Sequence, residues 1–79
     1  MKRIIHYDLH HKDTDDYQDL YDTLVKLNGK KITESVYWID TNLSQKDIVK
    51  KLKDTIQKDD KVYYISVDSK TNELFCYKI

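Results

Sequence analysis

The sequence predicts an α+β fold in which two helices cover one face of an antiparallel sheet. Three observations predict it. The chain has only 79 residues, β-favouring runs alternate along it with two amphipathic helical patterns, and it contains no proline and a single glycine, Gly29. A chain of this length makes one domain, so we expect residues 1–79 to form a single unit. A single glycine cannot form the glycine-rich loops of the Walker type or of dinucleotide-binding proteins, so both are excluded.

The first expected strand spans residues 2–9, where β-favouring residues alternate between two faces. One set is Ile5, Tyr7 and Leu9, and the other is Ile4, His6, Asp8 and His10. Asp8 therefore comes at the end of a strand, with three histidines around it. We expect any chemistry of this chain to lie here.

An amphipathic helix follows. Asp13 or Thr14 can cap its first turn, and Asp15 and Asp16 suit the positive end of the helix dipole. We expect Asn28-Gly29 to end it, with Gly29 in the left-handed cap conformation. Apolar residues recur at three- and four-residue spacing and predict one buried stripe: Tyr17, Leu20, Tyr21, Leu24 and Leu27.

The segment 30–41 predicts either two short strands with a bend near Glu34-Ser35 or one bulged strand. A second helix begins after Ser44, whose hydroxyl can cap it, with Asp47 three residues on. Its expected buried side comprises Ile48, Val49, Leu52 and Ile56.

A polar turn at 58–61 precedes a strong strand at 62–67, and a second turn at 69–72 leads to a last strand at 74–79. The order strand, helix, strand, strand, helix, strand is the ferredoxin-like βαββαβ plan, here with an extra C-terminal strand. Chains this small often gain buried surface by pairing, so we expect a homodimer.

Composition restricts the function classes. The 14 basic and 14 acidic side chains balance, which argues against a simple electrostatic nucleic-acid binder, and Arg3 is the only arginine. Cys76 is the only cysteine, which excludes an intrachain disulfide and a multi-cysteine zinc site. No signal-peptide core or membrane-spanning run is present, so we expect a soluble cytoplasmic protein that does not bind membranes.

Several short motifs occur together in a known order. They are Tyr7-Asp8-Leu9 at the end of the first strand, Asn28-Gly29, Ser35-Val36-Tyr37, Leu43-Ser44 and Asp59-Asp60-Lys61-Val62. In this order and spacing the chain resembles the small CRISPR-associated "Cas two" proteins over residues 3–68. Tyr7-Asp8-Leu9 and Thr41-Asn42-Leu43-Ser44 are most similar to the SinR-like offshoot of that superfamily.

The resemblance implies a ferredoxin-like homodimer in which the two first-strand aspartates face each other across the dimer axis. In nuclease-like members that aspartate, here Asp8, helps to hold a divalent metal, Mg²⁺ or Mn²⁺, for phosphodiester cleavage. In CRISPR adaptation the dimer is also a platform for DNA. The terminal strand, here 74–79, often adds to the partner subunit's sheet.

The chain also departs from that family. Nuclease-like members usually carry basic residues after the aspartate, whereas residues 1–28 contain four basic and six acidic side chains. An acidic first helix favours a second hypothesis, a non-enzymatic interaction module that binds a basic surface on another protein, for example in phage or mobile-element conflict.

Asp8 has two interpretations, a metal ligand or a strand-end aspartate that caps the following loop. His6, Asp8 and His10 alternate on one strand face, and together with His11 they are candidate ligands of a transition metal. The alternative is that His6 packs in the sheet while His10 and His11 lie on an exposed loop. The same histidines are the only candidate general bases.

The remaining candidates have structural alternatives. A lysine row, Lys46, Lys50, Lys51, Lys53 and Lys58, is either a phosphate-facing stripe or a solvated helix face interleaved with Asp47 and Asp54. The seven tyrosines and Trp38 are either base-stacking or packing residues, and Tyr63 and Tyr77 are those most in question. We expect Cys76 to be a buried, inert thiol.

Overall fold

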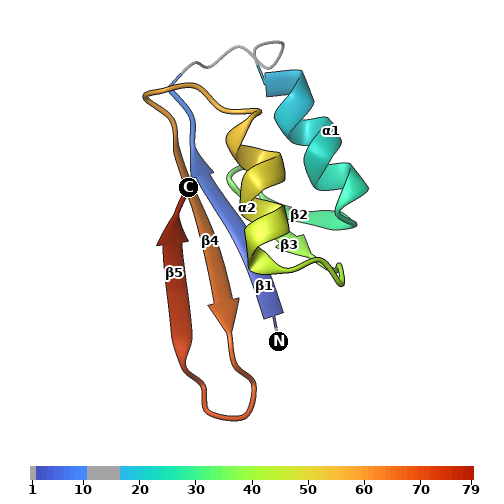
Figure 1. Ribbon diagram of the computed structural model, residues 1–79, viewed down its shortest axis with the longest axis vertical. Coiled ribbons are helices and arrows are strands. Elements are labelled where there is room, and N and C mark those ends of the chain that lie inside the picture. The colour runs from blue at the N-terminus through green and yellow to red at the C-terminus, as the bar shows by residue number, and fades with distance from the viewer. Residues whose placement is uncertain (1, 11–16) are drawn as a thin grey trace.

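The computed structural model, which describes residues 2–10 and 17–79, confirms the α+β prediction (Figure 1). The elements in chain order are β1 (Lys2–Asp8), α1 (Gln18–Lys26), β2 (Gly29–Thr33), β3 (Val36–Ile39), α2 (Gln45–Lys53), β4 (Lys61–Val67) and β5 (Leu74–Lys78). One antiparallel sheet has the strand order β2-β3-β1-β4-β5. Both helices lie on the same face of it. This is the ferredoxin-like arrangement with β5 added beside β4.

The core lies between the sheet and the two helices. The strands contribute every second residue, as the alternation in β1 and β4 predicted, and the helices contribute their apolar stripes. Its largest fully buried side chains are Ile5, Tyr17, Leu20, Leu24, Ile48, Leu52, Val62 and Tyr64. Burial of each stabilises the fold by roughly 1.5–3 kcal/mol relative to exposure. Among the described residues, no helix lies on the opposite face of the sheet, which is the face that carries Asp8.

Helix α1 begins at Gln18 after Tyr17, which makes no side-chain capping bond, while Asp13 to Asp16 lie outside the described residues. The expected left-handed glycine at its end is wrong. Asn28 has the positive φ, 56°, and Gly29 does not. Gly29 is needed for a different reason, because a Cβ there would lie 2.5 Å from the carbonyl oxygen of Leu24. The helix and β2 approach each other too closely for any side chain.

Between the helices the chain forms two strands, β2 and β3, with the bend at Glu34-Ser35 and a bulge between Lys31 and Thr33. The structure therefore contains both features that the sequence offered as alternatives.

The start of α2 is capped as predicted. The Ser44 hydroxyl accepts a hydrogen bond from the Asp47 backbone N–H at 3.2 Å. Arg3 reaches the same segment from β1, and its guanidinium donates to the backbone carbonyls of Leu43 and Thr41. The only arginine of the chain therefore fixes the approach to α2 and is not presented to solvent as a phosphate clamp.

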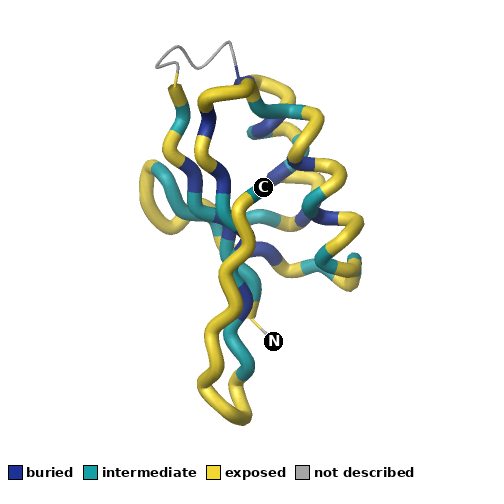
Figure 2. The backbone as a smooth tube through the Cα atoms, turned by 60° about the vertical axis from the view of Figure 1, so that its left-hand side comes forward, coloured by how far each residue is buried: buried dark blue, intermediate teal, exposed yellow. Residues whose placement is uncertain are grey.

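Strand β5 extends the sheet beyond the layer that the helices cover. It pairs with β4 of its own chain, and all five of its residues are exposed (Figure 2). The prediction of a buried thiol is wrong, since Cys76 is exposed. Its register opposite Ile65 places it on the open face, where no second layer covers it. Addition of β5 to a partner's sheet stays a prediction.

None of the helices in the described parts of the chain is long and apolar enough to span a membrane.

Candidate functional site at the end of the first strand

Asp8 is the last residue of β1 and is exposed. It pairs with Lys61, the first residue of β4, and directly paired residues point to the same side of a sheet. Because Ile5 and Tyr7 are buried under the helices, the pleat turns Asp8 to the open face together with Ile4 and His6. The carboxylate is thus presented at one end of the uncovered sheet face.

The chain leaving β1 is held by Asp60, a buried carboxylate that is only 5% exposed. Its Oδ1 accepts hydrogen bonds from the His10 backbone N–H at 2.6 Å and from the Tyr17 hydroxyl at 2.7 Å. Its Oδ2 accepts from the Gln57 backbone N–H at 2.7 Å. One carboxylate therefore ties together the end of β1, the start of α1 and the loop before β4.

Asp60 was not predicted as a buried residue, because residues 58–61 have the composition of a polar turn. The alternation of buried and exposed residues before β4 did indicate that Asp60 points inward. Asp60 is two residues before Val62 and so shares the alternation of the buried residues in β4, whereas Asp59 shares that of the exposed Lys61.

A hollow of about 310 Å³ surrounds Asp8. Its lining residues come from the end of β1 and from the turn before β4: Asp8, Leu9, His10, Asp59 and Lys61. Two carboxylates and an ammonium group thus share one open depression. Asp59 and Lys61, which the sequence offered only as parts of a motif, belong to the same site.

The expected histidine cluster does not form among the residues that the structure describes. Within residues 2–10 and 17–79, no three His, Cys, Asp or Glu side chains gather as a metal site. The His6 ring lies 6.1 Å from the ring of Tyr63, to which its strand pairs it, and is half-buried. His11 lies outside the described residues. Among the described residues, Asp8 therefore has no ready-made set of metal ligands around it.

The middle of the open face that leads to Asp8 is apolar, while Lys2, Lys61 and Lys78 lie towards the strand ends. Its half-buried or exposed side chains come from four neighbouring strands: Ile4, Val36, Trp38, Ile65, Val67 and Leu74. Trp38 is 38% exposed, with Lys2 Nζ 5.3 Å from the centre of its ring. Such a contiguous apolar surface is typical of an interface.

Tyr7, beside Asp8 in sequence, has a structural role. It points into the core and its hydroxyl donates to the Glu34 carbonyl oxygen at 2.8 Å. Burial, with smaller contributions from Tyr21, Tyr37 and Glu34, raises the pKa of Tyr7 well above its usual range. The phenol therefore stays protonated and secures the β2–β3 turn.

The two helices carry opposite charges. Asp19 and Asp22 are exposed on α1. On α2, Lys51 borders a depression together with Asp47 and Asp54. This agrees with the interpretation of a solvated helix face in which lysines and aspartates alternate. Lys46 and Lys53 line a hollow facing β5, Lys50 borders both hollows, and Lys58 is exposed beyond the helix. The solvated interpretation therefore describes part of the row, and the phosphate-facing one stays a prediction.

Comparison with known proteins agrees with this geometry. No curated protein matches the chain. The family described as CRISPR associated protein Cas2 matches residues 1–73, which include β1 with Asp8, both helices and β4. A match over so much of the chain, on a ferredoxin-like fold with the acidic residue at the end of β1, shows that the chain belongs to the CRISPR-associated Cas2 family.

Proposed function

We propose that this protein is a homodimer whose open sheet faces pack together, and that it cleaves phosphodiester bonds in nucleic acid with a divalent metal held between the two Asp8 carboxylates. The observation that carries the proposal is the position of Asp8, which is exposed at the end of an uncovered apolar sheet face.

The donor set suits Mg²⁺ or Mn²⁺. Mg²⁺ keeps several of its waters and is usually bound through one or two carboxylates together with substrate phosphates. One Asp8 from each subunit would supply such a pair. When bound, the ion supplies an activated water and neutralises charge on the phosphate.

The residues around Asp8 support that role. Lys61, paired with Asp8, places a positive charge where a phosphate would approach. Asp60 keeps the backbone at His10 in place, which holds the carboxylate of Asp8 at the rim of the hollow. His10 borders the same hollow and is the candidate base within the described residues.

The nuclease activity is tested by comparing the wild type with Asp8→Asn on DNA and RNA, in Mg²⁺, in Mn²⁺ and in EDTA. We expect metal-dependent cleavage by the wild type and a loss of roughly 100-fold or more in Asp8→Asn. Asp40→Asn is the matched control, because Asp40 is also an exposed aspartate at the end of a strand. Equal cleavage by wild type and Asp8→Asn, or none by either, removes the nuclease and leaves a nucleic-acid platform.

The dimer is tested by light scattering. We expect a mass twice the 9.5 kDa of one chain. Ile65→Lys, on the open face, should give the monomer mass because a charge cannot be buried there without a partner. Val25→Lys makes the same change at an exposed site on α1 and should remain dimeric. A monomeric wild type contradicts the shared site.

The acidity of α1 favours a second candidate function, a protein-interaction module that binds a basic surface. Asp19 and Asp22 are exposed on this helix. A lysine-rich peptide should then bind the wild type and lose affinity severalfold for the Asp19→Asn/Asp22→Asn variant. Equal binding by both proteins excludes α1 as the docking surface.

A further inference from the structure

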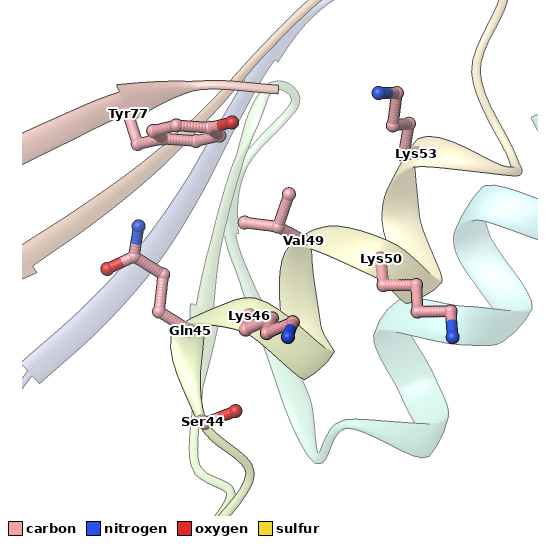
Figure 3. Close-up of a pocket in the computed structure, with 7 residues that line it drawn as sticks. All are labelled: Ser44, Gln45, Lys46, Val49, Lys50, Lys53 and Tyr77. Carbon is pink, nitrogen blue, oxygen red and sulfur yellow. The ribbon is translucent and has the colours of Figure 1, made fainter.

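A second hollow, of about 660 Å³, lies between α2 and β5 on the side of the sheet opposite Asp8. It forms because the helices do not extend over β5. Tyr77 is paired with the buried Tyr64 and so faces the helix layer, yet it is 44% exposed. Figure 3 shows its lining residues: Ser44, Gln45, Lys46, Val49, Lys50, Lys53 and Tyr77.

The charged residues that line this hollow are all lysines, namely Lys46, Lys50 and Lys53. Their spacing of four and three residues places them in one row along roughly 10 Å of the helix axis. The depression on the other side of α2 differs, because Asp47 and Asp54 balance the charges of Lys50 and Lys51 there. The hollow towards β5 is therefore the positive side of this helix.

An aromatic ring lies opposite the helix. In Figure 3 the Tyr77 ring is seen nearly edge-on, with Gln45 and Val49 of α2 across the hollow from it. Phe75, two residues earlier in β5, lies on the same face and is 48% exposed. The Ser44 hydroxyl at the rim of the hollow accepts the Asp47 N–H as the cap of α2.

We propose that this hollow binds single-stranded nucleic acid. One base would stack on Tyr77 while the lysine row pairs with successive phosphates, a combination that tolerates any sequence. The inference does not rest on Asp8.

Two alternatives fit less well. A duplex keeps its base faces inside its own stack, which leaves the exposed ring without a role. An acidic peptide would pair with the lysines, but it too would leave the flat ring without a stacking partner.

The test uses fluorescence anisotropy with a labelled 12-nucleotide strand, as DNA and as RNA, and with the corresponding DNA duplex. We expect both single strands to bind more tightly than the duplex. Lys46→Gln/Lys50→Gln/Lys53→Gln should weaken binding at least tenfold and reduce the slope of log affinity against log salt by about 2, since each single-strand phosphate contact contributes about 0.7. Lys26→Gln/Lys58→Gln/Lys70→Gln removes equal charge elsewhere and should change affinity less than twofold.

The ring is tested separately. Tyr77→Leu keeps an apolar side chain but removes the stacking surface, so affinity should fall roughly five- to 100-fold. Tyr77→Phe should bind as the wild type does. Circular dichroism melts confirm that each variant is folded.

Three results would overturn the proposal. The first is an equal loss of affinity in the two triple-lysine variants, and the second is wild-type affinity in Tyr77→Leu. The third is displacement of the strand by polyglutamate at matched charge, which would assign the hollow to an acidic protein. Binding is measured in EDTA, so it tests this hollow, while the metal-dependent cleavage assay tests Asp8. Failure of the nuclease proposal and failure of this one therefore give different results.

Discussion

Asp59 and Asp60 are adjacent in sequence, yet one lines an open hollow and the other is buried. The pleat of the chain entering β4 separates them. Asp60 points inward, where its carboxylate accepts hydrogen bonds from the distant His10 and Tyr17 and from the nearby Gln57. A buried charge is tolerated only with such partners, so this residue contributes to stability through a network and not through apolar burial.

Replacing Asp60 by alanine should therefore be costly. We expect Asp60→Ala to lower the free energy of unfolding by about 3 kcal/mol, because it leaves the Tyr17 hydroxyl and two backbone N–H groups without their acceptor. Urea denaturation measures this change. Asp59→Ala, at the exposed neighbour, should stay within about 0.5 kcal/mol of the wild type. Similar losses in both variants would contradict the network.

At the scale of elements, the junction between α1 and β2 shows how a helix ends without a left-handed glycine. Asn28 takes the positive φ, as short polar side chains can. Gly29 then lets the backbone of β2 pass against the Leu24 carbonyl. Asn28 thus supplies the positive φ and Gly29 the close backbone approach, two roles that one glycine usually combines.

Substitutions separate these tasks. Asn28→Ala should lower the free energy of unfolding by about 1 kcal/mol, and Asn28→Gly should leave it nearly unchanged, since glycine accepts positive φ. Gly29→Ala should cost about 1–3 kcal/mol from steric overlap. Thermal or urea denaturation distinguishes these values. A neutral Gly29→Ala would show that α1 and β2 can separate at no cost.

At the scale of the whole molecule, the features that the sequence predicted correctly are those that depend on local pattern. Alternation located β1 and β4, the apolar stripes located both helices, and Ser44 marked the start of α2. The features that it missed depend on which elements become neighbours. Cys76 is exposed because β5 lies outside the helix layer. Asp60 is buried because His10, just after β1, and Tyr17, just before α1, both donate hydrogen bonds to it.

The same limit applies to the site. The position of Asp8 at a strand end followed from the sequence, but its hollow with Asp59 and Lys61 required the pairing of β1 with β4. The histidines were grouped by spacing alone. The fold instead packs His6 against Tyr63 and uses the backbone of His10 to bind Asp60.

A dimer formed through the open face makes stability depend on concentration. The wild-type melting temperature should rise by roughly 3–6 °C for each tenfold increase in protein concentration, because association stabilises the folded chain by mass action. Ile65→Lys should melt at one temperature over the same range. Differential scanning fluorimetry from micromolar to millimolar concentrations measures this. A constant melting temperature in the wild type would contradict the dimer.

The two edges of the sheet differ in a way that limits assembly. The β2 edge is interrupted by its bulge and carries Lys30 and Lys31, features that discourage strand addition. The β5 edge is regular and exposed. If chains join edge to edge, each copy has one usable side, so two β5 strands can meet but a third chain finds no place to add. Growth of separate chains by this route alone stops at a closed pair.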